Sequence, residues 1–234
     1  MKFIKVKSYA KINISLNVIA KLSSSFHKIE SLVTFINLHD SMYIKPIKNK
    51  NHKIHFNGKF SKNIIKDNTV KNLLNILDKK NFLNGKKFEI KITKNIPQKS
   101  GMGGGSMNAA SVLKYLLKKN FLKIDKNRIK KIANLIGKDV ILGLELKNTI
   151  LSSNGNLTKT KKKLGFYVLV IKPNFGCSTK FIYSKIRSFS KPKYNKPRIS
   201  LLSRINIVNS NNDLEKIAFK KYPTLKNLKL FLLK

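Results

Sequence analysis

The feature that most constrains this chain is a glycine-rich stretch between a predicted strand and a predicted helix. Four of the 11 glycines lie within residues 101–105. Upstream, residues 87–93 alternate polar and apolar side chains, as a half-buried strand does. Downstream, residues 109–117 have helical apolar spacing. Glycine lets backbone approach a bulky ligand, and a helix start offers N–H groups. The arrangement therefore indicates an anion site, most often for phosphate.

The alternatives for this stretch are a flexible turn, a Walker A loop and a Rossmann fingerprint. A flexible linker is seldom framed by a strand and a helix. The Walker A pattern needs Gly-Lys-Ser/Thr, but Gly105 is followed by Ser106 and Met107. A Rossmann loop opens a first βαβ unit and has an acid about twenty residues later. Asp125 lies at about that distance, but its context is that of a helix cap, and the loop lies far from the N-terminus.

Composition is typical of a globular, cytoplasmic protein. The 234 residues, 41% of them apolar, allow one large or two small domains with a core. The single cysteine, Cys177, excludes a disulfide framework and indicates a reducing compartment. We expect no membrane span, because no run of about 18 apolar residues occurs, and the N-terminus lacks a signal-peptide core.

The net charge of +40, from 50 Lys and Arg against 10 Asp and Glu, would ordinarily suggest nucleic acid. The basic residues are spread over the chain and are nearly all lysine, whereas readers of bases and phosphates favour the arginine fork. Lys, Asn and Ile have A/T-rich codons, so mutational drift explains the charge as well as selection does. We expect no specific nucleic-acid partner, only nonspecific binding at low salt. A basic nucleic-acid-binding protein, with steep salt dependence, stays an alternative.

The order of predicted elements favours an α+β fold over a parallel α/β fold. Five extended segments are predicted early in the chain: 2–7, 9–19, 29–37, 42–47 and 53–56. A turn is predicted at 23–27, and the last two segments are predicted to pair with each other. Two capped helices frame the strand–loop–helix unit. The first begins at Asp67 or Asn68, and the second begins at Asp125 and ends at Gly137.

The second half of the chain is predicted to be smaller and more irregular. A short strand is expected at 149–152, and the polar stretch 158–163 is the candidate boundary between two domains. Residues 166–171 are the most strand-like run in the chain and are expected to be buried. The tail from residue 213 onward has the spacing of a helix.

Candidate catalytic side chains are few because carboxylates are scarce. Asp213, like Asp125, lies at a predicted helix start and is interpreted as a cap, and Asp40 as a turn residue. Asp139 differs, because it follows the helix stop Gly137 in a tight turn that leads into apolar sequence. From the residues alone it is either a turn-stabilising side chain or a functional acid. The four histidines lack the spacing of a zinc site.

Three sequence blocks lie in register along the chain. They are Tyr-Ala-Lys-Ile-Asn at 9–13, the glycine-rich block at 97–110 and Gly-Lys-Asp-Val at 137–140, with Phe26 and His27 between the first two. Together they resemble the 4-diphosphocytidyl-2-C-methyl-D-erythritol kinase family of the GHMP kinase superfamily, from about residue 3 to residue 187 and weakly beyond.

The resemblance implies a GHMP kinase two-domain α+β fold. Residues 1–157 would form an N-terminal domain similar to the ribosomal protein S5 domain 2-like fold and carry the phosphate loop. Residues 158–234 would form a C-terminal α/β sandwich, incomplete here.

The resemblance also implies a kinase of non-mevalonate isoprenoid biosynthesis. Such an enzyme transfers the γ-phosphate of ATP, with Mg²⁺, to the 2-hydroxyl of 4-diphosphocytidyl-2-C-methyl-D-erythritol. Asp139 matches the family's catalytic base, and Lys11 matches the lysine beside it. A neighbouring ammonium keeps a carboxylate ionised, and phosphoryl transfer depends mostly on positioning and electrostatics.

Binding residues follow from the same resemblance. Phe26 matches the aromatic side chain that stacks on cytosine, His27 the histidine that bonds its edge, and Tyr183 a second stacking aromatic. Asn13 is similar to a substrate-contacting asparagine. The ATP-binding loop is expected to comprise Pro97, Gln98, Lys99, Ser100, Gly101, Met102, Gly103, Gly104, Gly105, Ser106 and Met107. The sequence identifies neither Mg²⁺ ligands nor an oligomeric state.

The chain departs from the family pattern at several positions. Lys99 and Ser100 replace small or glycine residues in the loop, Met107 replaces a serine, and Lys138 and Ile141 replace a small residue and a proline. The family's final glycine-rich segment and strand would begin about where this chain stops, so an unpaired sheet edge is expected there. A catalytically impaired member of the family that only binds nucleotide is therefore a further alternative.

Overall fold

The structure, a computed structural model, describes residues 2–23, 26–64, 68–161 and 164–233. Three expectations fall wholly or partly outside these ranges: a cap at Asp67, the turn at 23–27 and the boundary stretch 158–163. The chain forms two compact units that interleave in sequence. They comprise Met1–Lys11 with Phe35–Leu146 (unit 1) and Ile12–Thr34 with Lys147–Lys234 (unit 2). The boundaries of these units differ from the predicted domain boundary at residue 157. The division into two domains at that residue stays a prediction.

Two long strands run through both units. They are β1 (Ile4–Lys21), which pairs with β2 (His27–Ile47). Each joins two segments that the sequence predicts as separate. The polar residues at the joins, Ser8 and Asp40, are fully buried within the strands. The prediction of Asp40 as a turn residue is therefore wrong. Inside the strand, its carboxylate pairs with Lys94 and accepts hydrogen bonds from two backbone N–H groups.

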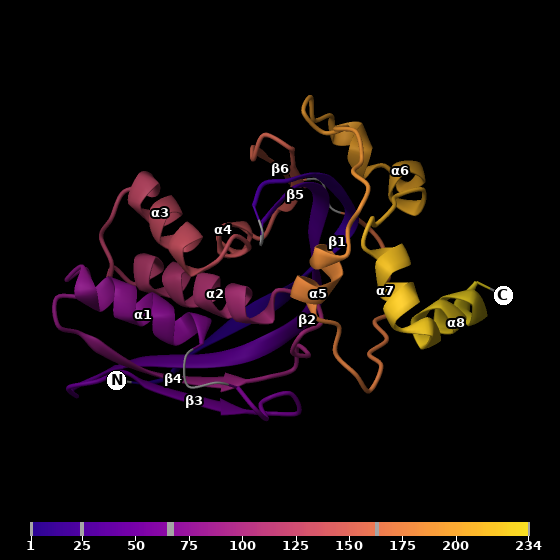
Figure 1. Cartoon of the computed structure of the whole chain (residues 1–234). Coiled ribbons are helices and arrows are strands. Elements are labelled where there is room, and N and C mark those ends of the chain that lie inside the picture. The colour runs from indigo at the N-terminus through magenta and orange to yellow at the C-terminus, as the bar shows by residue number, and fades with distance from the viewer. Residues whose placement is uncertain (1, 24–25, 65–67, 162–163, 234) are drawn as a thin grey trace. The chain divides into compact units, whose positions relative to one another are not determined.

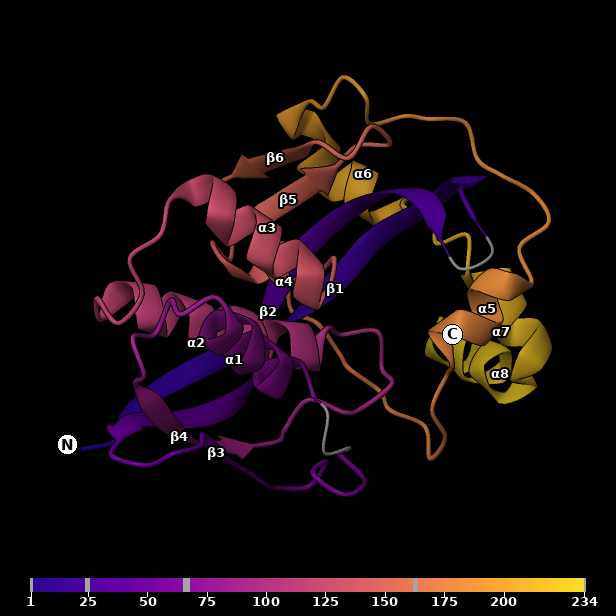
Figure 2. The same cartoon turned by 60° about the vertical axis from the view of Figure 1, so that its left-hand side comes forward.

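The sheet of unit 1 is covered on one face by helices (Figures 1 and 2). Strand β4 (Lys87–Thr93) pairs antiparallel with β2 and in parallel with β3 (Lys53–Asn57). It therefore separates the two segments, 42–47 and 53–56, that the sequence predicts as a pair. Alternate side chains of β4 are fully buried, which suits its central position: Phe88, Ile90 and Ile92.

Four helices complete unit 1: α1 (Thr69–Lys79), α2 (Gly104–Lys118), α3 (Lys126–Ile136) and α4 (Val140–Gly143). The predicted caps are confirmed at Asn68 and Asp125, whose side chains each accept hydrogen bonds from two backbone N–H groups, and α3 ends at Gly137. Leucines on one face of α1 and of α2 pack against β4 in one core cluster. This core fixes the end of β4 and the start of α2, and with them the loop that joins them.

Unit 2 contains two short strands and mainly short helices. The strands are β5 (Asn148–Leu151), which pairs antiparallel with β2, and β6 (Leu157–Thr160), which pairs with β5. The helical segments are α5 (Thr179–Ser184), η1 (Ile199–Leu202), α6 (Arg204–Val208), α7 (Glu215–Lys221) and α8 (Pro223–Leu232). The fully buried Glu30 accepts hydrogen bonds from the backbone N–H groups of Ser153, Lys193 and Tyr194. It thereby anchors an irregular stretch to β2.

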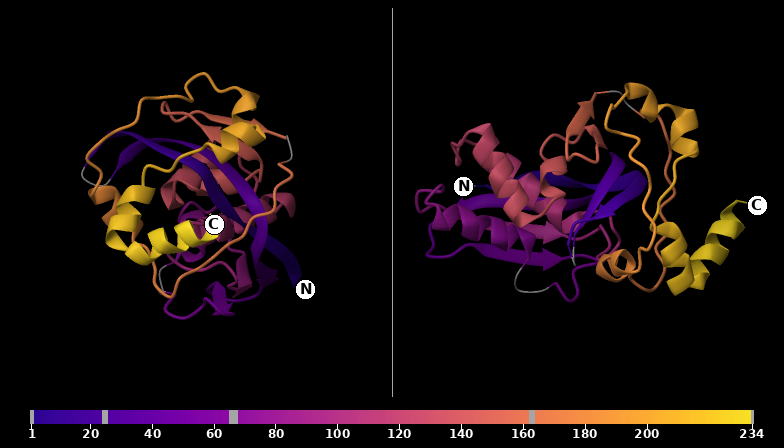
Figure 3. Two further views of the ribbon diagram at one scale, coloured as in Figure 1. Left: turned by 90° about the vertical axis from the view of Figure 1, so that its right-hand side faces the viewer. Right: turned by 45° about the horizontal axis from the view of Figure 1, so that its top comes forward.

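Three predictions for unit 2 differ from the structure. Residues 166–171 form no strand and are exposed; Leu169, for example, is 77% exposed. Apolar and β-branched composition favours a strand only where a partner strand supplies the pairing. The predicted tail helix is two helices, because Pro223 lacks an N–H group and starts α8 (Figure 3). Asp213 caps neither of them; its Oδ2 accepts hydrogen bonds from Val18 and Ser190.

In the part of the chain that the structure describes, no helix is both long enough and apolar enough to cross a membrane.

Candidate active site

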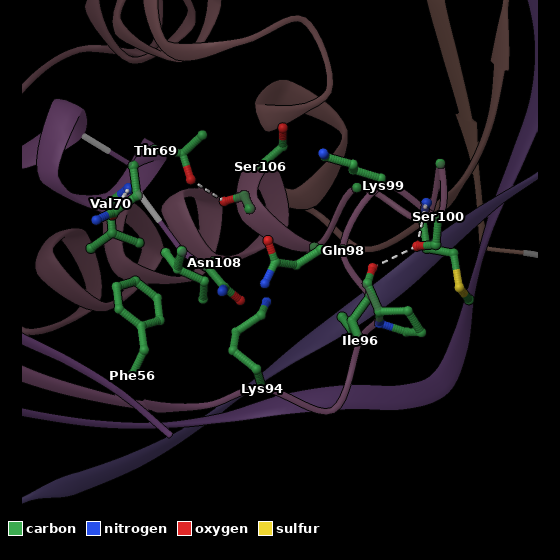
Figure 4. Close-up of a pocket in the computed structure, with 18 of the residues that line it drawn as sticks. Phe56, Thr69, Val70, Lys94, Ile96, Gln98, Lys99, Ser100, Ser106 and Asn108 are labelled. Carbon is green, nitrogen blue, oxygen red and sulfur yellow. Dashed lines mark hydrogen bonds between the residues drawn. The ribbon is translucent and has the colours of Figure 1, made fainter. Parts of the chain in front are cut away.

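The glycine-rich loop lines a cavity of about 440 Å³ in unit 1 (Figure 4). Ten of the eleven predicted ATP-binding residues, 97–106, line this cavity. The first turn of α1, Phe56 and Lys94 supply further lining. The predicted phosphate loop therefore borders a space that a small ligand can enter, with the start of α2 on its wall.

The eleventh predicted residue, Met107, is not among the residues that line the cavity. Its side chain is buried, and a Cβ on Gly143 would lie 3.0 Å from its sulfur. Its backbone N–H donates to the carbonyl of Gly103 within the first turn of α2. A methionine here thus fills the core between α2 and α4 and not the cavity.

The backbone of the loop turns through left-handed conformations at three positions. The φ angles are 52° at Lys99, 72° at Gly101 and 68° at Gly103. Three hydrogen bonds from side-chain hydroxyl and amide groups hold these turns in place. Ser100 Oγ donates to the carbonyl of Pro97 at 2.7 Å, and the Gln98 amide donates to two backbone carbonyls of the 60–62 segment at 2.8 and 2.7 Å. The loop is therefore fixed by its own side chains as well as by its glycines.

Gly103 brings the loop into contact with the predicted catalytic pair. A Cβ at this position would lie 3.0 Å from Lys11 Cγ and 3.7 Å from Asp139 Oδ2. In addition, a side chain would be strained at its positive φ. Glycine is thus required here for two reasons, the backbone conformation and the close approach of Lys11.

Lys11 and Asp139 lie together, as the resemblance implies. Lys11 Nζ is 3.4 Å from Asp139 Oδ2, and the side chains are 8% and 40% exposed. Asp139 precedes α4, yet its side chain makes no capping hydrogen bond. The turn-stabilising role that the sequence left open for Asp139 therefore finds no support. A carboxylate that is open on one side and faces an ammonium on the other can accept a proton from a ligand.

The predicted substrate-binding residues lie in unit 2. The rings of His27 and Tyr183 are in contact, with centroids 5.2 Å apart and planes tilted by 37°. Burial lowers the pKa of His27 below its ordinary value, and the charge of Lys21 lowers the pKa further. Phe26 is 52% exposed, and Asn13 Nδ2 donates to Ser31 Oγ at 2.7 Å. The structure thus brings His27 and Tyr183 together.

Two charged residues of unit 1 were missed by the sequence reading. Asp40 and Lys94 form a buried ion pair, and Lys94 lines the cavity. The available signals were an acid that interrupts two strand-like segments and a lysine three residues before Pro97. Neither signal is specific in a chain with this many lysines.

Within the described ranges, no three His, Cys, Asp or Glu side chains lie close enough together to hold a metal ion. Side-chain oxygens available near the loop include the Ser106 hydroxyl, which lines the cavity, and the Asp139 carboxylate.

Comparison with known proteins places this fold and loop in one class of enzymes. Residues 68–146, which contain the loop, match the model of the GHMP kinases N terminal domain. Among solved structures, that of a 4-(cytidine 5'-diphospho)-2C-methyl-D-erythritol kinase has a TM-score of 0.72 at 22% identity, covering 96% of this chain and 81% of that one. A homoserine kinase from Cytophaga hutchinsonii has a TM-score of 0.52 at 18% identity, covering 82% and 62%. The predicted GHMP kinase fold is confirmed.

Sequence relatives narrow the class to one family. The chain is 57% identical over 232 residues to the 4-diphosphocytidyl-2-C-methyl-D-erythritol kinase of Pelagibacter ubique (strain HTCC1062), covering 99% of this chain and 82% of the relative. It is 33% identical to the enzyme of the same name from Clostridium botulinum (strain Langeland), covering 95% and 81%. This chain belongs to the 4-diphosphocytidyl-2-C-methyl-D-erythritol kinase family.

Proposed function

We propose that this protein transfers the γ-phosphate of ATP to the 2-hydroxyl of 4-diphosphocytidyl-2-C-methyl-D-erythritol. The observation that carries the proposal is the Lys11–Asp139 pair, 3.4 Å apart, beside a glycine-rich loop that lines a cavity. The name of the relative with 57% identity supports the choice of substrate. The reaction belongs to isoprenoid precursor synthesis by the non-mevalonate route.

In the proposed reaction, ATP lies along the phosphate loop, residues 97–106. Gly101 and Gly103 allow the backbone to approach the phosphates, and the start of α2 places N–H groups and a partial positive charge near them. Ordered donors of this kind stabilise negative charge without having to reorganise. The loop's role is thus to bind the triphosphate and to position its terminal group.

Mg²⁺ is proposed to enter with ATP. Magnesium bound to a nucleotide takes most of its ligands from phosphate oxygens and water, with few from the protein. Ser106, which lines the cavity at the start of α2, is the residue proposed to complete its coordination. When bound, the ion neutralises charge on the phosphates.

Asp139 is proposed to be the base that receives the proton of the attacking hydroxyl. The O–H bond breaks as the hydroxyl oxygen bonds to the γ-phosphorus; the proton passes to the carboxylate, and ADP leaves. Lys11, whose side chain is only 8% exposed, offsets charge on the transferred group. Most of the rate enhancement would come from this positioning.

The cytidine part of the substrate is proposed to bind through unit 2. Phe26 and Tyr183 offer aromatic faces for the cytosine, and such stacking contributes about 1–3 kcal/mol per base. A lowered pKa keeps His27 neutral near pH 7, so that its ring can offer one donor and one acceptor to the base edge. Asn13, whose amide bonds Ser31, is proposed to contact the substrate from β1.

The test is release of ADP from Mg-ATP with and without 4-diphosphocytidyl-2-C-methyl-D-erythritol. Turnover that depends on this substrate supports the proposal. Bound ATP without turnover would instead support the impaired, nucleotide-binding alternative. Absence of both turnover and ATP binding, together with salt-dependent binding of nucleic acid, would favour the basic nucleic-acid-binding alternative.

A further inference from the structure

A buried ion pair lies where the phosphate loop leaves β4. Lys94 Nζ donates to Asp40 Oδ2, and the two side chains are 5% and 0% exposed. The second oxygen, Asp40 Oδ1, accepts hydrogen bonds from the backbone N–H groups of Asn95 and Ile96, both at 2.8 Å. One carboxylate of β2 thus fixes the lysine and the first residues of the loop together.

The ammonium of Lys94 reaches the first turn of α2. A Cβ on Gly104 would lie 3.3 Å from Lys94 Nζ. Figure 4 shows the Lys94 side chain extending toward Gln98 and Asn108, which line the same cavity. An ammonium carries three donors, and over the described ranges the Lys94 side chain has one hydrogen-bond partner, Asp40. Two donors therefore remain for oxygen atoms of a group bound in the cavity.

We propose that Asp40 is a positioning residue of the nucleotide site: it holds the Lys94 ammonium at the start of α2 to bind an anionic oxygen of ATP, and it fixes the entry of the phosphate loop. The inference rests on the proposed kinase function. Burial explains why a carboxylate is needed, since an ammonium without a partner is costly to bury.

The competing explanation is a pair that only stabilises the fold. The two explanations differ in one respect that can be measured. Removing one partner of a buried pair strongly destabilises a protein, whereas replacing both by uncharged side chains of similar size is often neutral. A purely structural pair would therefore be restored by double replacement, but a pair that presents Lys94 to ATP would not.

The experiment compares Asp40→Asn, Lys94→Met and the double variant with the unmodified protein. Calorimetry gives the Kd of Mg-ATP without acceptor, turnover gives the KM of each substrate, and thermal unfolding gives stability. Glu89→Gln is the matched control, because Glu89 lies on β4, pairs with Lys45 at 3.1 Å and is not among the residues that line the cavity.

We expect Lys94→Met and the double variant to weaken ATP binding about tenfold or more, the effect of losing one hydrogen bond from a charged group. The KM for the acceptor should change less than about twofold, and the control should bind ATP normally. The double variant should unfold near the temperature of the unmodified protein, so the test holds even if Asp40→Asn alone does not fold.

A double variant that binds ATP as well as the unmodified protein would overturn the inference and leave the kinase function standing. If the unmodified protein binds ATP but does not phosphorylate the acceptor, the proposed kinase function fails. The ATP Kd values of the variants then test the inference on their own. If the unmodified protein does not bind ATP, both fail.

Discussion

The backbone N–H of Lys11 donates to the carbonyl of Met102 at 3.1 Å, so that a residue of β1 is tied directly to the phosphate loop. The ammonium of the same lysine lies 3.4 Å from Asp139 Oδ2. A shift of the loop would therefore move Lys11 relative to Asp139. The loop that would bind ATP and the pair that would activate the acceptor are thus linked through one residue.

Asp139→Asn should lower kcat by about 10²–10⁴-fold, the usual contribution of a general base. Asparagine keeps the size of the side chain but cannot take the proton of the acceptor hydroxyl. The Kd of Mg-ATP should stay nearly unchanged, because the loop donors remain. Turnover and calorimetry check both expectations.

The control for this substitution is Asp125→Asn, which changes an exposed carboxylate that caps α3. Its kcat should match that of the unmodified protein, since asparagine is also a good cap. A rate for Asp139→Asn within a few-fold of the unmodified rate would show that another group takes the proton.

Gly103→Ala should reduce both stability and kcat. The methyl group would be strained at φ 68° and would press on Lys11 Cγ from 3.0 Å, displacing the ammonium from Asp139. Gly101→Ala is the matched control, because its φ of 72° is similar but nothing lies within 4 Å of the added Cβ. Both variants should lose about 1–3 kcal/mol of unfolding free energy. If Gly103→Ala loses no more activity than Gly101→Ala, the contact with Lys11 is not functionally important.

The strand–loop–helix unit was predictable because its signals are local. Alternation in β4, the glycine spacing and the caps at Asn68 and Asp125 all act within a few residues, and the structure confirms them. The Lys11–Asp139 pair was different, since no local pattern links residues so far apart in sequence. It was expected only through resemblance to a family.

The failures have a common physical cause, which is that long-range partners decide burial. Asp40 is flanked by polar neighbours that suit a turn, but a lysine from β4 and two backbone N–H groups hold it inside. The apolar run 166–171 has strand propensity but no strand conformation. Propensity is read from the run itself, whereas pairing depends on residues elsewhere.

Phe26→Ala should raise the KM for the cytidine substrate by about 10- to 100-fold, because one stacking contact of about 1–3 kcal/mol is lost. The KM for ATP should stay within about twofold of the unmodified value. Steady-state kinetics with each substrate varied in turn measure the two constants separately. Phe189→Ala is the control, since Phe189 is 47% exposed against 52% for Phe26. An equal rise in the KM of both substrates would show that Phe26 does not bind the cytosine.

Stability should fall as the pH drops below about 6.5, the ordinary pKa of histidine, because of His52. Burial lowers the pKa of His52, although the nearby Asp78 carboxylate opposes this effect. His52 Nδ1 accepts a hydrogen bond from the N–H of Phe88 at 3.0 Å, while Nε2 lies 3.1 Å from Asp78 Oδ2. Protonation at Nδ1 would break the bond to Phe88.

The sign follows from proton binding. With a lowered folded pKa, the unfolded chain binds more protons between the folded pKa and about 6.5. The free energy of unfolding therefore decreases as the pH falls through this window. Urea unfolding at a series of pH values should show this loss for the unmodified protein. His55→Gln, which changes an exposed ring, should keep it, whereas His52→Gln should reduce it. An unchanged pH profile in His52→Gln would assign the loss to other groups.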